Sequence, residues 1–168
     1  MTPHIVNLLF LLLVAAPQES PEIAEVRHFM EVRSDAWEKW DFDALGAQFA
    51  EDAERWDARG HVFEGRADID KHCREAFKTE ESRQIRFQHK IDKIRIVTPG
   101  VAMVDASWKT ELPSSKEKAV ETPATQHAPG NRQGKSFLIL RKNAHSDWEI
   151  VSLRASFTES NKEDEDAD

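Results

Sequence analysis

The stretch IRFQHKIDKIRI, residues 85–96, decides the fold of this 168-residue chain more than any other part. Apolar residues alternate with polar ones as far as Ile91, and this period of two predicts a β-strand with one buried face. The apolar series then continues at Ile94 and Ile96, one residue out of step. Such a slip indicates a β-bulge near Asp92–Lys93, and a bulge bends a strand. We therefore expect a strongly bent sheet.

Three more strands are expected after this one. Residues 102–108 alternate with period two after a turn at Pro99–Gly100, and residues 137–140 and 148–157 give two further apolar stretches. Between the first and second of these strands, residues 113–135 are rich in Pro, Ser, Lys, Thr and Gly and predict a long loop, either a lid over the cone or, as the lack of an apolar anchor favours, a disordered insertion. The four long strands are expected to pair as an antiparallel sheet.

Helical patterns precede the strands. Ser20 and Pro21 form a favourable helix start, and apolar spacing continues to Trp40, which predicts a helix of about five turns. Asp41 can cap a second, shorter helix that buries residues as far as Phe49. The first two elements of the domain are therefore expected to be helices.

A β-hairpin and a third helix are expected next. Residues 54–63 read as a small hairpin with Gly60 near its turn, and Gly65 precedes a helix whose apolar face carries Ile69 and Cys73. Helices must cover one face of the bent sheet. The sequence therefore predicts an α+β, cone-shaped fold in which three N-terminal helices pack on a strongly bent antiparallel sheet.

The two ends of the chain differ from this domain. Residues 1–19 contain a short, uncharged, Leu-rich run that ends in Ala15–Ala16, the layout of a secretory signal peptide, with a retained N-terminal anchor as the alternative. Residues 159–168 carry six acids and one lysine, and predict a disordered acidic tail. We therefore expect an exported protein, periplasmic or extracellular, with a single domain over residues 20–158.

Composition excludes several classes of function. The formal net charge is −8, and no cluster of Lys and Arg offers a basic face for nucleic acid. Cys73 is the single cysteine, so no internal disulfide can form. The histidines have no metal-ligand spacing, and neither a phosphate-binding glycine-rich loop nor a dinucleotide fingerprint is present. We expect no metal, no cofactor, and no membrane contact beyond the possible N-terminal anchor.

Five segments carry a family resemblance: WEKWDFDAL (37–45), FAEDA (49–53), FEGRADI (63–69), VAMVDASW (101–108) and WEIVSLR (148–154). They resemble the nuclear-transport-factor-2-like superfamily, and within it the SnoaL-like proteins of the SgcJ/EcaC-like subgroup. The resemblance covers nearly all of residues 22–158. It implies a cone-shaped fold and a homodimer formed through the outer face of the sheet.

The resemblance also places the catalytic positions of ketosteroid isomerases on this chain. The general-base aspartate falls on Asp57, the oxyanion tyrosine on Arg33, and the protonated oxyanion aspartate at or beside Ser136. Because that reaction needs two neutral donors aimed at a developing enolate, and both are replaced, ketosteroid isomerisation is not expected here. Asp57 is retained as the candidate general base.

Arg33 lies where the first helix calls for an apolar residue, so it is expected to be buried. A buried arginine needs a partner or a ligand. Either Arg33 forms an internal salt bridge with Asp57, or Arg33 holds an anionic or carbonyl group of a ligand. Five aromatic or histidine residues are further candidates for ligand contact, and each could instead simply pack in the core. These candidate ligand-binding residues are Trp37, Trp56, Phe87, His89 and Trp108.

Three functions are compatible with this sequence. The first is a domain that holds a small, partly apolar molecule in a conical pocket. The second is a cofactor-free lyase, isomerase or cyclase that uses Asp57 as general base. The third is a structural homodimer module with a filled cone. An open cavity in which Arg33 and Asp57 do not touch would favour a ligand.

Overall fold

The computed structural model describes residues 19–80, 82–111 and 132–158. Nearly all of the predicted leader and most of the predicted loop lie outside these residues, as does the acidic tail. The loop was expected to extend to residue 135, but strand β5 already begins at Arg132, so this boundary was wrong. Residues 132–135 belong to the sheet because each pairs with a residue of β4 or β6.

Helix α1 (Pro21–Glu38) begins where the sequence predicted. Ser20 caps it, with its Oγ accepting a hydrogen bond of 3.3 Å from the amide of Ile23. Its buried stripe includes Val26, Met30 and Arg33. The helix ends two residues before Trp40, which takes a positive φ of 55° that interrupts the right-handed helix.

The second helix is shorter than expected. Helix α2 (Phe42–Ala47) is capped by Asp41, but Phe49 opens strand β1 (Phe49–Trp56) instead of closing the helix. This part of the prediction was wrong. Phe49 is only 2% exposed, and β1 pairs in parallel with the distant strand β6 at that residue and again from Glu54 to Trp56. Pairing across the fold therefore determines the conformation of these residues.

The predicted hairpin and third helix are both confirmed. Strand β1 pairs antiparallel with β2 (Val62–Glu64), and Gly60 between them has a φ of 88°, a conformation that favours glycine. Gly65 then leads into helix α3 (Arg66–Ala76), which buries Ile69 and Cys73.

The remaining elements are a short 3-10 helix η1 (Ser82–Gln84) and the strands β3 (Arg86–Thr98), β4 (Val101–Glu111), β5 (Arg132–Lys142) and β6 (Trp148–Phe157). The sheet has the order β2-β1-β6-β5-β4-β3. The four long strands pair antiparallel with one another, as predicted, and among the described strands only the β1–β6 pair is parallel.

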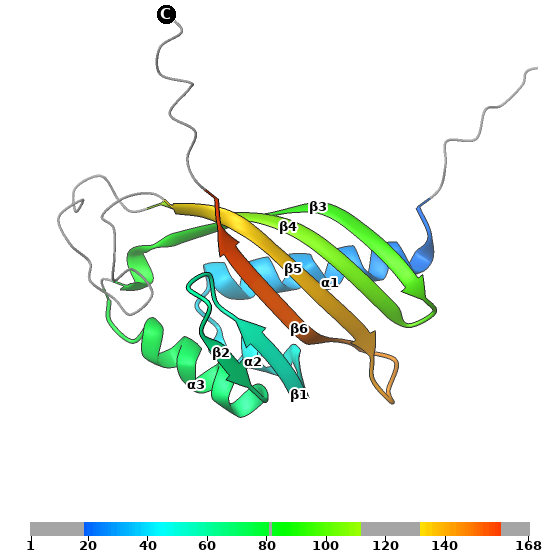
Figure 1. Cartoon of the computed structure of the whole chain (residues 1–168), viewed down its shortest axis with the longest axis horizontal. Helices are drawn as coiled ribbons and strands as arrows, with labels where there is room; N and C mark the ends of the chain where they lie inside the picture. The colour runs from blue at the N-terminus through cyan, green and yellow to red at the C-terminus, as the bar shows by residue number, and fades with distance from the viewer. Residues whose placement is uncertain (1–18, 81, 112–131, 159–168) are drawn as a thin grey trace, which may run out of the picture.

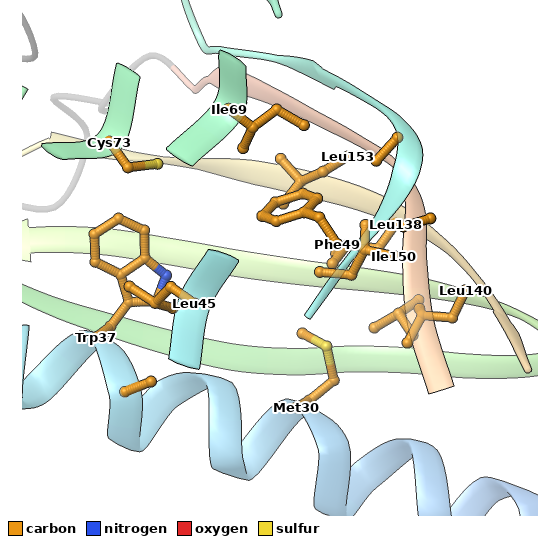
Figure 2. Packing of buried hydrophobic residues seen from close by; sticks show 14 of the residues in the cluster. Met30, Trp37, Leu45, Phe49, Ile69, Cys73, Leu138, Leu140, Ile150 and Leu153 are labelled. Carbon is orange, nitrogen blue, oxygen red and sulfur yellow. The ribbon is translucent and has the colours of Figure 1, made fainter. Parts of the chain in front are cut away.

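The sheet curves over the first helix. The register of β3 against β4 shifts between Ile91 and Lys93, which confirms the bulge predicted at Asp92–Lys93. Figure 1 shows the long strands arching side by side across α1, with α2 and α3 gathered near β1 and β2. In Figure 2, Met30 and Trp37 of α1 point toward the buried side chains of α2, β1 and the sheet. The α+β, cone-shaped fold is confirmed.

Candidate functional site

A cavity of about 170 Å³ lies between α1, α3 and the concave face of the sheet. This volume is similar to that of an engineered cavity of ~150 Å³ that binds benzene. Most of the wall is apolar and includes Met30, Phe77, Ile85, Leu138 and Leu153. The cone is therefore not filled, which argues against the third function considered from the sequence, a structural module with a filled cone.

Five of the six ligand-binding residues named from the sequence line this cavity: Arg33, Trp37, Phe87, His89 and Trp108. The candidate general base, Asp57, lines it too. Their elements explain the convergence. Phe87 and His89 alternate along β3, and His89 lies opposite Trp108 of β4 in the register of the sheet. Ser136, the position matched to the second oxyanion donor of the isomerases, also lies in the wall.

Trp56 is the exception, since it does not line the cavity. Neighbouring residues of a strand point to opposite faces, so the inward placement of Arg55 and Asp57 turns Trp56 outward. There the guanidinium carbon of Arg154 lies 4.9 Å from the Trp56 ring centroid. The prediction that Trp56 belongs to the apolar wall was wrong.

Arg33 is a buried cation with one neutral partner. The residue is 7% exposed, its Nη1 donates a hydrogen bond of 3.0 Å to Gln48 Oε1, and its guanidinium carbon lies 5.1 Å from the Phe49 ring centroid. Burial is the main reason why the pKa of Arg33 falls from its ordinary value to about 10. No carboxylate in the described part of the chain forms an ion pair with it. Burying an ion without a counter-charge costs several kcal/mol.

Asp57 is engaged elsewhere. Its Oδ1 accepts hydrogen bonds from the backbone amides of Arg59 (2.8 Å) and His61 (2.9 Å), and its Oδ2 lies 2.9 Å from His61 Nδ1. Burial raises the pKa of Asp57, but these three hydrogen bonds outweigh it and lower the pKa overall. Asp57 is therefore anionic and already satisfied, and the expected alternative of an Arg33–Asp57 salt bridge was wrong.

Two histidines in the wall are neutral at physiological pH. Burial is the largest cause for both, and it lowers the pKa of His89 and of His72 to about 4. The second cause is a nearby positive charge, Arg33 for His89 and Arg55 for His72. The rings also pack against aromatic neighbours, since the centroid of His72 lies 3.8 Å from that of Phe63. Both imidazoles can therefore offer one donor and one acceptor to a ligand.

Sequence reasoning missed three further arginines in the wall: Arg55, Arg59 and Arg132. Arg55 Nη1 contacts Cys73 Sγ at 3.2 Å. Arg59 Nη2 is buried without a hydrogen-bond partner among the described residues. Arg55 could have been found, because it lies two residues before Asp57 in an extended segment, where residues two apart point to the same side. With neutral histidines, the four arginines and Asp57 give the lining a formal charge of +3.

Metal-ligand clusters and membrane-spanning helices are both absent from the described residues. No group of three or more His, Cys, Asp or Glu lies close enough together there to hold a metal ion. Within the same ranges, no helix is both long and apolar enough to span a membrane.

Comparison with known proteins identifies the fold. No protein-family profile matches this sequence, and no curated protein matches it. Solved structures do match. A domain of unknown function with a cystatin-like fold from Nostoc punctiforme has a TM-score of 0.66 at 22% identity, over 85% of this chain and 81% of its own.

Two other structures carry more specific descriptions. An NTF-2-like protein of unknown function from Shewanella oneidensis has a TM-score of 0.65 at 16% identity, over 80% of this chain and 98% of its own. A ketosteroid isomerase-like protein from Erwinia carotovora has a TM-score of 0.66 at 13% identity, over 84% and 100%. The fold is therefore that of nuclear-transport-factor-2-like proteins, as the sequence resemblance implied.

Proposed function

Starting from this fold, we propose that the protein binds a small, partly apolar molecule in the cavity between α1 and the sheet. One observation carries the proposal: the cavity is open and apolar, while the cation buried in its wall, Arg33, is not neutralised by Asp57. Natural ligand sites combine an apolar wall with a few placed polar groups in the same way.

A cofactor-free lyase, isomerase or cyclase is the second candidate. It is favoured by Asp57, which lines the cavity and with its partner His61 forms a pair that could exchange a proton with a ligand. Three hydrogen bonds that lower the pKa of Asp57 make it a weak base, however. We therefore place binding ahead of catalysis.

A matched pair of substitutions tests the binding proposal. Ala155 lines the cavity, whereas the next residue, Ser156, is exposed and does not. Ala155→Phe should fill the cavity, and Ser156→Phe adds the same side chain outside it. Saturation-transfer NMR with a set of single-ring aromatic molecules should detect binding to the wild type and to Ser156→Phe. The affinity of Ala155→Phe for the same molecules should be at least tenfold weaker. Equal binding to both variants would show that the cavity is not the site.

We also propose a homodimer formed through the outer face of the sheet. In β4, buried Ala102, Val104 and Ala106 alternate with partly exposed residues that include Met103. Phe137 and Ile139 of β5 lie on the same outer side and are also partly exposed. Light scattering of the wild type should give twice the mass of one chain, and Met103→Glu should reduce the measured mass to that of a single chain. A monomeric wild type would contradict the proposal.

A further inference from the structure

We propose that the ligand of the cavity is a small monoanion: a carboxylate on a single aromatic or alicyclic ring, with the carboxylate bound by Arg33 and the ring against the apolar wall. This inference rests on the proposed binding function and names its ligand class. It depends on the charges that converge on the cavity.

The first support is the state of Arg33. A guanidinium has five N–H donors in a planar fork that matches a carboxylate, but the described residues offer this one a single acceptor, Gln48 Oε1. Arg33 is only 7% exposed, so little of its guanidinium can bond to bulk water instead. An anion that enters the cavity would supply both the counter-charge and the missing acceptors.

The second support is the field around Arg33. Arg55 also lies in the wall, where the thiol of Cys73 is its hydrogen-bonding partner. Burial is the largest cause of the lowered pKa values of His89 and His72, and the second cause is this positive field, through Arg33 for His89 and Arg55 for His72. The excess of positive charge is local, since the whole chain has a formal charge of −8. Attraction of an anion therefore has to come from the cavity itself.

The third support is that the wall has no free negative charge to repel an anion. Asp57 is the only carboxylate among the described lining residues, and Arg59 and His61 occupy its oxygens. Phe87 and Leu138 offer an apolar surface for a ring. With about 170 Å³ available, the space suits one ring and one charged group.

Three molecules of nearly equal shape test this inference by calorimetry: benzoate, benzamide and benzamidinium. We expect wild-type protein to bind benzoate at least tenfold more tightly than benzamide, and benzamidinium more weakly than either. Arg33→Met should remove the preference for benzoate. As the matched control, Arg95→Gln should keep it, because Arg95 lies outside the cavity and is paired with Asp105.

Failure of this inference is separable from failure of the binding proposal. If benzamide binds as tightly as benzoate while Ala155→Phe still prevents binding, the cavity is a ligand site but not an anion site. If none of the three molecules binds the wild type, the proposed ligand class is wrong.

A readout on the unaltered protein covers the case in which Arg33→Met does not fold. The charged group that acts on His89 is Arg33 of α1, and the rings packed against it, Trp37 and Phe87, do not titrate. A carboxylate bound at Arg33 should therefore raise the pKa of His89, followed by NMR of the imidazole. Benzamide should not. Identical His89 titrations with both molecules would overturn the proposal.

Discussion

Arginines on the two sides of the sheet differ in their partners. On the outer face, Arg95 lies 3.5 Å from Asp105, Arg154 lies 3.2 Å from Glu54, and Arg141 lies 2.7 Å from Asp52. On the cavity side, Arg33 is more deeply buried than any of them and has only an amide partner. Exposed pairs contribute little to stability, whereas a buried unpaired cation is costly. The arrangement of the cavity side is therefore explained by binding better than by stability.

The largest expected effect separates the packing of the two faces. Leu138 is 1% exposed in the core, and the next residue, Ile139, is partly exposed on the outer face. Leu138→Ala should lower the free energy of unfolding by about 2–5 kcal/mol because it opens a cavity, and Ile139→Ala by roughly 1 kcal/mol. Urea denaturation measures both. Equal losses would mean that the two faces are equally well packed, as a fully covered outer face would be.

The second effect concerns the buried cation. Without ligand, the double variant Arg33→Met/Gln48→Leu should raise the free energy of unfolding by about 1–4 kcal/mol, because it replaces a buried polar pair by apolar side chains. The matched outer-face variant Arg95→Met/Asp105→Leu should change it by less than about 1 kcal/mol. If the first variant is destabilised, Arg33 serves the fold more than the ligand.

A smaller effect appears with pH. The pKa of His89 is about 4 in the folded protein, below its ordinary 6.5, so between these values the unfolded chain binds a proton that the folded one excludes. Stability from this group is present above pH 6.5 and is lost as the pH falls toward 4. Between pH 7 and pH 5, His89→Gln should lose less stability than wild type, by on the order of 1–2 kcal/mol.

The control for this pH effect is His28→Gln, since the side chain of His28 is 78% exposed. Its loss of stability between pH 7 and pH 5, measured by urea denaturation, should match that of the wild type. If both histidine variants follow the wild-type profile, His89 is not buried in the way described.

The smallest effect is expected at Trp56. Its Nε1 is buried without a hydrogen-bond partner among the described residues, and its ring contacts Arg154 outside the cavity. Trp56→Phe removes the unsatisfied donor and also weakens the ring contact, so stability should change by less than about 1 kcal/mol. Ligand affinity in the NMR assay should stay as in wild type, whereas Trp37→Phe, in the wall, should weaken it. A loss of affinity in Trp56→Phe would place this ring in the site.

Much of the fold could be predicted from local patterns. The period of two and its slip at Asp92–Lys93 gave the bent strand, while Ser20 and Gly60 marked a helix start and a turn. The same patterns could not find the parallel pairing of β1 with β6, because it joins Phe49 to Ile150 across about a hundred residues. This pairing is also why Phe49 was assigned to the wrong element.

The sequence alone determined that Arg33 would be buried, because helical spacing places it on an apolar stripe. Trp56 and Asp57 were both expected in the site, although neighbours along an extended segment point to opposite sides, so this alternation could have separated them. Only the tertiary structure decided that Gln48 accepts a hydrogen bond from Arg33, that His61 lies within hydrogen-bonding distance of Asp57, and that Arg55 lines the same cavity as Arg33. The physical reason is that neutralising a buried charge depends on which groups from distant segments come within a few ångströms, and local periodicity carries no information about that distance.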